Sequence, residues 1–394
     1  MAAGHNHHVL DLCLFLTTAM VLLQNTMAYP LSTNSRWIVN EGGQRVKLAC
    51  VNWPSHLQPV VAEGLSQQPV TEIANRIVAM KFNCVRLTWP LELAINDTLA
   101  NSVTVRQSFQ SLGLNDDIDG IQRKNPNFID LPLIEALKTV VNVLGQKGVM
   151  VILDNHLTVP GWCCSAGDGN GFFGDRFFDP TAWINGWKKM AGIFNGVSNV
   201  IGMSLRNELR GRKQNVNDWY TYMQQGAEAI HSVNPNVLVI MSGLGFDTDL
   251  SFVQNRPVSL SFAGKLVFEL HWYSWYGGID WGAGNACGKF RDKVKWKAGF
   301  LLDKGFPLFV SEFGIDQTTT SDKEKSYIDC FLGWMAETDV DWALWALTGS
   351  YYLRDGARRA DEHFGALTTD WILARNPYFL ARLPFRARSA LRGK

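Results

Sequence analysis

Apolar and polar positions alternate along the chain in a regular way. Continuous apolar runs of strand length recur, and each is followed by a polar or glycine-rich loop and then by a stretch with helical apolar spacing. The apolar runs predict strands at 47–53, 84–90, 149–154, 200–207, 237–242, 266–273, 307–313 and 341–347. The amphipathic stretches predict helices at 71–80, 133–146, 181–194, 216–233, 289–304 and 321–337.

Apolar strands that alternate with helices predict a parallel sheet covered by helices. Local signals delimit several helices: Pro180 opens one, and Gly148 and Gly305 end two others just before a strand. Short helix-to-strand turns and long strand-to-helix loops lead us to expect an α/β fold, a single (β/α)8 TIM barrel over residues 29–394. The alternative, an open doubly wound sheet, usually has a glycine-rich nucleotide turn after its first strand. The chain has NWPSH there, at 52–56.

The charge balance narrows the range of partners. Lys and Arg number 37 against 36 Asp and Glu, for a net charge of +1, and 46% of the residues are hydrophobic. Nucleic acids and anionic membranes attract a basic excess, so neither is expected as the main partner. We expect a monomer that needs no cofactor.

The two ends of the chain differ from the rest. The apolar run at 12–23, followed by Thr26-Met27-Ala28, predicts an export signal over residues 1–28. This run is shorter than the roughly 20 residues that cross a bilayer. We therefore expect a mature protein without a membrane segment, secreted to the extracellular space or cell wall. The segment 373–394 carries six Lys or Arg and no acid, which predicts a short helix and a solvated basic tail.

Neither the cysteines nor the acidic run at 116–120 predicts a metal site. Removal of the signal leaves six cysteines, and their pairing stays open. Cys163 and Cys164 are adjacent in a glycine-rich loop without a nearby His at ligand spacing, which favours disulfides over zinc. The acidic run at 116–120 lacks the Glu that closes a calcium loop, so we expect it to be solvated. A glycosylation sequon begins at Asn96, in a predicted loop.

Polar side chains collect where the predicted strands end. In a barrel these ends meet in one bowl, which is where barrel enzymes place their active sites. Taken singly, each residue can be an ion-pair partner, a cap or a core residue. Their convergence favours function, because a buried carboxylate without a task is costly. The positions at or just after strand ends are Asp154, His156, Asn207, Glu208, His271, Tyr273 and Glu312, and Arg86 in the second strand and Trp345 in the eighth join them.

Glu208 and Glu312 end the fourth and seventh predicted strands. Glycoside hydrolysis needs such a pair, one acid to protonate the departing oxygen and a second group to act at the anomeric carbon. Tryptophan faces near the mouth suit stacking on sugar rings, although some must serve packing. These tryptophans are Trp53, Trp89, Trp162, Trp272, Trp275 and Trp281.

The ordered motifs DNH (154–156), RNE (206–208), HWY (271–273) and SEFG (311–314), together with Arg86 and Trp345, resemble glycoside hydrolase family five. This is the cellulase and mannanase family of clan A, and NELRG (207–211) resembles its plant branch. The resemblance covers residues 36–377. It implies that Glu208 is the general acid/base and Glu312 the nucleophile of a retaining mechanism. Glu208 then needs a raised pKa in order to arrive protonated.

The resemblance also implies which residues bind the substrate. They are Arg86, His156, Asn207, His271, Tyr273 and Trp345. Asn207 would hold the sugar 2-hydroxyl, and Trp345 would lie under the reacting ring. Because Arg86 and Tyr273 would flank Glu312, we expect the pKa of Glu312 to be lowered.

The main hypothesis is a secreted retaining glycosidase of a β-linked polysaccharide, of the cellulase-like endo-β-glucanase or β-mannanase type. Leu209 departs from the Pro that follows the acid/base in many relatives. One alternative is therefore a carbohydrate-binding cell-wall protein with weak or no turnover. Another is a metal-dependent barrel hydrolase with Asp154, His156 and His271 as ligands. Glu269 shares a strand face with His271, and we expect it to pair with a buried His or Arg.

Overall fold

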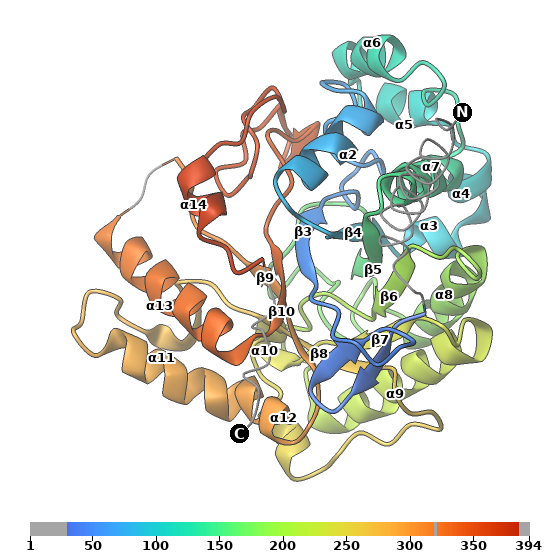
Figure 1. Ribbon diagram of the computed structural model, residues 1–394. Coiled ribbons are helices and arrows are strands. Elements are labelled where there is room, and N and C mark those ends of the chain that lie inside the picture. The colour runs from blue at the N-terminus through green and yellow to red at the C-terminus, as the bar shows by residue number, and fades with distance from the viewer. Residues whose placement is uncertain (1–29, 319–320, 386–394) are drawn as a thin grey trace, which may run out of the picture.

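The computed structural model describes residues 30–318 and 321–385 (Figure 1). At its centre is a closed barrel of eight parallel strands that follow chain order, with the last strand paired to the first. The strands are β3 (Ala49–Trp53), β4 (Cys84–Pro90), β5 (Met150–Leu157), β6 (Val200–Ser204), β7 (Leu238–Met241), β8 (Leu266–His271), β9 (Leu308–Phe313) and β10 (Asp341–Leu344). Each strand lies within a predicted apolar run or overlaps it, which confirms the TIM barrel.

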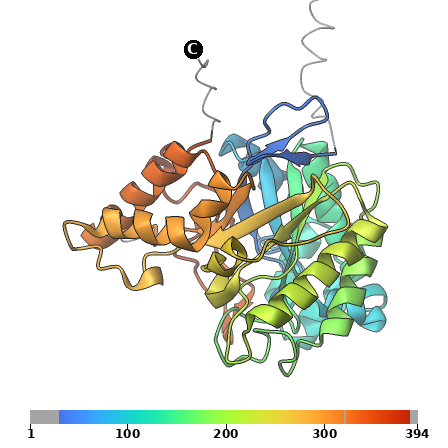
Figure 2. The ribbon, with the colours of Figure 1, turned by 90° about the horizontal axis from the view of Figure 1, so that it is seen from below.

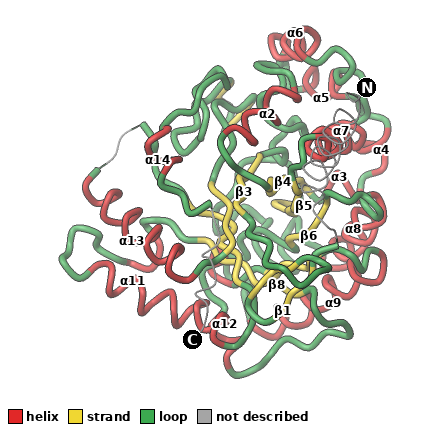
Figure 3. Tube along the Cα trace, in the orientation of Figure 1, coloured by secondary structure: helices red, strands yellow, loops and turns green. Residues whose placement is uncertain are grey.

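The helices surround the strands on the outside (Figure 3). Helix α2 (Val70–Ala79) shows why they do so, because its buried residues Val70, Ile73, Ala74 and Ile77 recur at helical spacing. The other long helices are α7 (Leu133–Gln146), α8 (Pro180–Ile193), α9 (Val216–Val233) and α13 (Asp322–Thr338). The stretch predicted at 289–304 is helical as α11 (Ala286–Val294), η3 (Lys295–Gly299) and α12 (Phe300–Asp303).

Four short helices between β4 and β5 were not predicted. They are α3 (Glu92–Ile95), α4 (Asp97–Asn101), α5 (Val105–Ser111) and α6 (Asn115–Lys124). The acidic run at 116–120 lies in α6, and Asp117 is buried and accepts a hydrogen bond from Ser66 Oγ at 2.7 Å, so the solvated prediction was wrong for this residue. The sequon Asn96 is the one residue between α3 and α4 and caps α4, because its side chain accepts the Leu99 N–H, while the other two sequon residues lie in α4.

Smaller elements complete the described chain. They are β1 (Ser32–Asn34), β2 (Trp37–Val39), α10 (Leu244–Asp247), η1 (Ser251–Gln254), η2 (Tyr276–Gly278), β11 (Leu353–Arg354), β12 (Ala357–Arg358) and α14 (Pro377–Ala381). The hairpin β1–β2 lies at one end of the barrel (dark blue in Figure 2). The predicted export signal lies outside the described residues, as does the basic tail beyond Phe385. Over the described ranges, every helix is too short or too polar to traverse a bilayer.

The barrel interior consists of two layers. The apolar layer, next to the hairpin, is one packed cluster: Leu31, Ile38, Leu48, Cys50, Cys84, Met150, Ile152, Ile201, Leu238, Ile240, Val267, Phe309 and Ala343. Two residues further along several of the same strands, side chains on the same face are polar and fully buried. This polar layer consists of Asn52, Arg86, Asp154, Ser204, Glu269 and Ser311.

Three disulfides join the six cysteines of the described chain. Cys50–Cys84 links β3 to β4 inside the apolar layer, and Cys287–Cys330 links α11 to α13. Cys163–Cys164 joins neighbouring residues in the loop after β5. The preference for disulfides over zinc is confirmed.

Candidate active site

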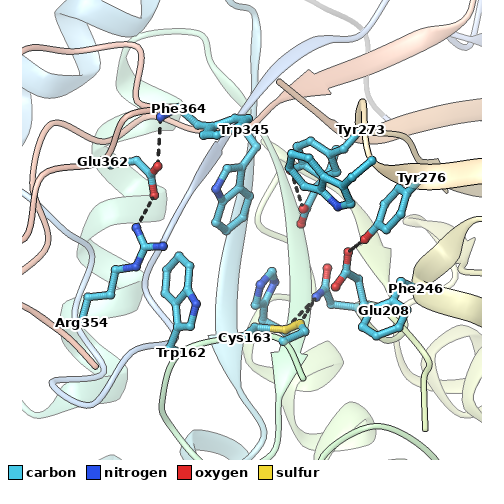
Figure 4. Close-up of a pocket in the computed structure, with 15 residues that line it drawn as sticks. Trp162, Cys163, Glu208, Phe246, Tyr273, Tyr276, Trp345, Arg354, Glu362 and Phe364 are labelled. Atoms are coloured by element: carbon cyan, nitrogen blue, oxygen red, sulfur yellow. Dashed lines mark hydrogen bonds and ion pairs between the residues drawn. A yellow bond between two sulfur atoms is a disulfide. The ribbon is translucent and has the colours of Figure 1, made fainter. Parts of the chain in front are cut away.

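A pocket of about 450 Å³ opens at the C-terminal ends of the strands (Figure 4). Most of the predicted site residues line it: His156, Asn207, Glu208, Tyr273, Glu312 and Trp345. Arg86 and His271 are fully buried and contact the lining carboxylates from below. All eight predicted site residues therefore meet at one place.

The strand ends differ from the prediction in one respect. Strand β6 ends at Ser204, so Asn207 and Glu208 lie in the loop beyond it. The chain bends there because the Asn207 N–H bonds to the Asn155 carbonyl at 3.0 Å, and Glu208 adopts a left-handed backbone with φ of 46°. A non-glycine residue in this region is strained, and such strain concentrates at functional sites.

Arg86 is the cation at the centre of the cluster. Its Nη1 lies 2.9 Å from Glu312 Oε1, and its Nη2 lies 2.8 Å from Asp154 Oδ1 and 3.1 Å from Asn207 Oδ1. Glu269 Oε2 lies 3.8 Å from the same Nη2, which confirms the predicted pairing of Glu269 with a buried Arg. The guanidinium thus holds side chains from β5, β8 and β9 and from the loop after β6 in place at the same time.

The two predicted catalytic carboxyls face each other. A carboxyl oxygen of Glu208, one of Glu312 and a ring nitrogen of His271 lie within 4.8 Å of one another. Tyr273 donates its hydroxyl to Glu312 Oε2 at 3.1 Å, and Tyr276 donates to Glu208 Oε1 at 3.1 Å. His271 Nδ1 is 3.1 Å from Glu208 Oε1 and 3.6 Å from Glu312 Oε2.

Burial dominates the ionisation of this pair. It raises the pKa of Glu208 to about 7 and the pKa of Glu312 to about 7. The prediction of a lowered pKa for Glu312 was therefore wrong, because loss of hydration outweighs the opposing effects of His271 and Arg86. The two carboxylates also repel each other when both are charged, so the pair retains one proton between them. Direct pairing with Arg86 favours Glu312 as the charged member.

Aromatic rings form the pocket walls. Trp345 follows β10 and stacks on His156 with ring centroids 5.5 Å apart. Trp275 is exposed and stacks on Tyr273 at 4.6 Å. Trp53, Trp89 and Trp272 are fully buried, and Trp281 is nearly so and does not line the pocket; these four are packing residues.

Opposite the carboxyl pair, the wall carries charges that were not predicted. The Arg354 guanidinium lies over the Trp162 ring at 3.7 Å and pairs with Glu362 at 3.2 Å. Figure 4 shows Trp162, Arg354 and Glu362 on one side and Glu208 and Tyr276 on the other. The lining residues that the sequence did not indicate are Cys163, Cys164, Phe246, Tyr276, Arg354, Glu362 and Phe364. Tyr276, three residues after Tyr273, was the one that the aromatic run could have indicated.

The metal-ligand set considered from the sequence does not come together. Asp154 Oδ2 is 2.6 Å from His156 Nδ1, whereas His271 contacts Glu208 instead. Among the described residues, His271 is grouped at metal-ligand distances with Glu208 and Glu312. The Arg86 guanidinium already brings positive charge to that group through Glu312.

A closed parallel barrel with two facing carboxyls and aromatic walls at its C-terminal mouth defines the class of barrel glycoside hydrolases. Comparisons with known proteins agree. The family model described as Cellulase (glycosyl hydrolase family 5) matches residues 39–350. A glycosyl hydrolase 5 family protein of Chamaecyparis obtusa is 46% identical over 382 residues, covering 93% of this chain and 68% of that protein.

More distant proteins are similar in sequence or in fold. An endoglucanase of Paenibacillus polymyxa is 24% identical over 373 residues, covering 88% of this chain and 84% of that protein. The structure of a Pyrococcus horikoshii endocellulase with cellotetraose superposes with a TM-score of 0.71 at 20% identity, covering 91% of this chain and 99% of that one. The chain belongs to glycosyl hydrolase family 5, the cellulase family, and the predicted resemblance is confirmed.

Proposed function

We propose that the protein is a secreted retaining glycosidase that cleaves a β-linked glucan, with Glu208 as acid/base and Glu312 as nucleophile. The observation that carries this proposal is the short distance between the two carboxyls, whose oxygens lie within 4.8 Å. Retaining enzymes hold their carboxyls about 5–5.5 Å apart, whereas inverting enzymes leave about 6.5–9.5 Å for a water.

In the first step, Glu312 attacks the anomeric carbon while Glu208 protonates the departing oxygen. The bond to the leaving sugar breaks, and a glycosyl ester to Glu312 forms. Arg86 and Tyr273, which hold the two Glu312 oxygens, keep the attacking carboxylate aligned. The raised pKa of Glu208 lets it enter the step protonated near neutral pH.

In the second step, Glu208 is a carboxylate and takes a proton from water, which attacks the same carbon. The ester to Glu312 breaks and the enzyme returns to its starting protonation. Asn207, whose Oδ1 is held by Arg86, is positioned to bond the 2-hydroxyl of the reacting sugar. Trp345 supplies the flat face under that sugar.

Support for a glucan comes from the relatives, because endoglucanases match most of the chain and one endocellulase structure contains cellotetraose. A mannan substrate is the nearest alternative within the same reaction. Export is supported by the three disulfides, which persist in oxidising compartments, and by the apolar run at 12–23.

Mechanism-based labelling tests the roles. A 2-fluoro aryl cellobioside should give a stable ester on Glu312, seen as a mass increase of the peptide that contains it. Product sizing on cellulose derivatives, mixed-linkage glucan and mannan then identifies the substrate. Labelling at another residue would overturn the assignment, and saturable glucan binding without turnover would support the carbohydrate-binding alternative.

A further inference from the structure

Asp247 is a buried carboxyl beside the site to which no role has yet been given. It is the last residue of α10, the short turn after β7, in which Gly245, Phe246 and Asp247 adopt left-handed backbone angles in succession, with φ of 62°, 60° and 56°. The Asp247 side chain is fully buried. Two adjacent non-glycine residues in this conformation are costly, so the surrounding contacts must hold the loop in place.

The contacts of this loop lead to Glu208. Asp247 Oδ2 accepts the backbone N–H of Glu208 at 2.9 Å, and the N–H of Phe246 bonds to the Leu209 carbonyl at 2.9 Å. Glu208 is itself left-handed. Two strained backbone segments from neighbouring strands therefore hold each other, and Asp247 satisfies the one backbone donor that Glu208 offers.

The side chain of Glu208 is also held. Tyr276 donates its hydroxyl to Oε1, and His271 Nδ1 faces the same oxygen, both at 3.1 Å. His271 Nε2 lies 3.6 Å from Asp247 Oδ2, beyond a hydrogen bond but close enough for a charge to influence which ring nitrogen carries the proton. Because these contacts converge on Oε1, Oε2 is left to carry the transferred proton.

We propose that Asp247 and Tyr276 are positioning residues for Glu208, Asp247 through the backbone amide and His271, and Tyr276 through the carboxyl group. This inference rests on the acid/base role proposed above for Glu208. The other charged groups around Asp247 are Glu269 from β8 and Arg86 from β4. Together these contacts fix the direction in which Glu208 presents its proton to the leaving oxygen.

Leaving-group dependence separates this role from a structural one. Cellobiosides of phenol need protonation of the leaving oxygen, whereas those of 2,4-dinitrophenol do not, and kcat/KM reports the steps from free enzyme up to and including cleavage of this bond. For Asp247→Ala we expect kcat/KM to fall on the order of 10²-fold with the phenyl substrate and less than about threefold with the dinitrophenyl substrate. Tyr276→Phe should show the same split at about tenfold.

Matched controls lie nearby. Asp249, two residues further along the chain, pairs with Lys297 and Ser251. Asp249→Asn should therefore leave kcat/KM unchanged with both substrates. Tyr220 bonds to the Arg256 carbonyl away from the pocket, so Tyr220→Phe serves as the control for Tyr276→Phe. Thermal unfolding of each variant checks the fold. If Asp247→Ala does not fold, Asp247→Asn, which keeps an acceptor oxygen, and Tyr276→Phe carry the test.

Glu208→Gln provides the reference for interpreting these results. One result would leave the proposed function standing and show that the positioning role is wrong. In it, Glu208→Gln lowers kcat/KM for the phenyl substrate alone, whereas the folded Asp247 and Tyr276 variants lower kcat/KM equally for both substrates or for neither. If Glu208→Gln itself shows no split, or if Glu312→Gln remains active, the proposed function fails first.

Discussion

The two layers of the barrel interior are built by the same strands and have opposite properties. In β4, Cys84 belongs to the apolar layer and Arg86, two residues on, to the polar layer; in β9 the corresponding pair is Phe309 and Ser311. Burial of the side chains in the apolar layer stabilises the folded state. The side chains of the polar layer lose their hydration on folding. Ion pairs such as that between Arg86 and Asp154 offset this cost. One strand thus serves stability at one level and chemistry at the next.

This comparison implies that the two layers fail in different ways when changed. A substitution near the polar layer should remove activity and leave the fold intact, whereas one in the apolar layer should do the reverse. Strand β9 offers both within four residues, at Glu312 and Phe309.

The largest effect is expected for Glu312→Gln. Turnover of glucan should fall about 10⁴-fold or more, because the covalent route is lost. The free energy of unfolding should stay the same or rise, since a buried charge next to Glu208 is removed. Steady-state rates and urea unfolding measure both quantities. A clear loss of stability would show that the polar layer also supports the fold.

Phe309→Ala tests the apolar layer. Its side chain is fully buried inside the barrel, so we expect the free energy of unfolding to fall by about 3–5 kcal/mol. The kcat of the folded fraction should change less than about threefold. Phe309→Leu, which leaves a smaller cavity, should cost less. A large loss of kcat at full folding would mean that the layers are coupled.

The pH dependence of stability should report the active-site pair. The pKa values of Glu208 and Glu312 rise from 4.5 to about 7 on folding, so the folded state binds protons more tightly. Their stabilising contribution is full below pH 4.5 and is lost as pH rises through 7. Relative to the Glu208→Gln, Glu312→Gln double variant, wild-type stability should fall by roughly 3–7 kcal/mol over that range. Urea titrations at several pH values measure it, and a flat difference would contradict the raised values.

The smallest effect is expected from the Cys163–Cys164 disulfide. It closes no loop between distant residues, so Cys163→Ser with Cys164→Ser should change the free energy of unfolding by less than about 0.5 kcal/mol. KM should rise a few-fold because Asn207 Nδ2 lies 3.5 Å from the Cys163 sulfur. Loss of Cys50–Cys84, which spans 34 residues in the apolar layer, should cost about 3–4 kcal/mol in the same assay.

The barrel could be predicted because its strands are buried along their whole length and read as continuous apolar runs. The helices α3 to α5 could not, because segments of 4 to 7 residues carry too few turns for a clear periodic pattern, and α6 could not because its only large apolar residues are Ile118 and Ile121. Asp117 looked like one charge in an acidic surface run. Its burial depends on Ser66, a residue distant in sequence, and no local pattern shows that.

The candidate site also contains residues that could be predicted from the sequence and residues that could not. Glu208 and Glu312 were identified because polar residues at the ends of predicted strands stand out against apolar runs, and Arg86 because it is a charge inside such a run. Asp247 lies six residues beyond the end of β7 and reaches Glu208 only through three left-handed residues, a backbone path that sequence patterns do not specify. The pKa of Glu312 was mispredicted because its charged neighbours were visible in the sequence and the depth of its burial was not.

The pairing of β10 with β3 also sets the order of events during synthesis. Asn52 in the first strand bonds to the Leu344 carbonyl in the last, 292 residues away, while Glu312 and Trp345 come from the final two strands. Before β10 docks, β3 and β9 both present open edges, and contacts this distant in sequence close slowly. A chain whose last strands have not yet docked therefore holds Glu208 without Glu312 beside it. The pocket is complete only once the whole barrel has closed, so the site forms at the last step of folding and not before it.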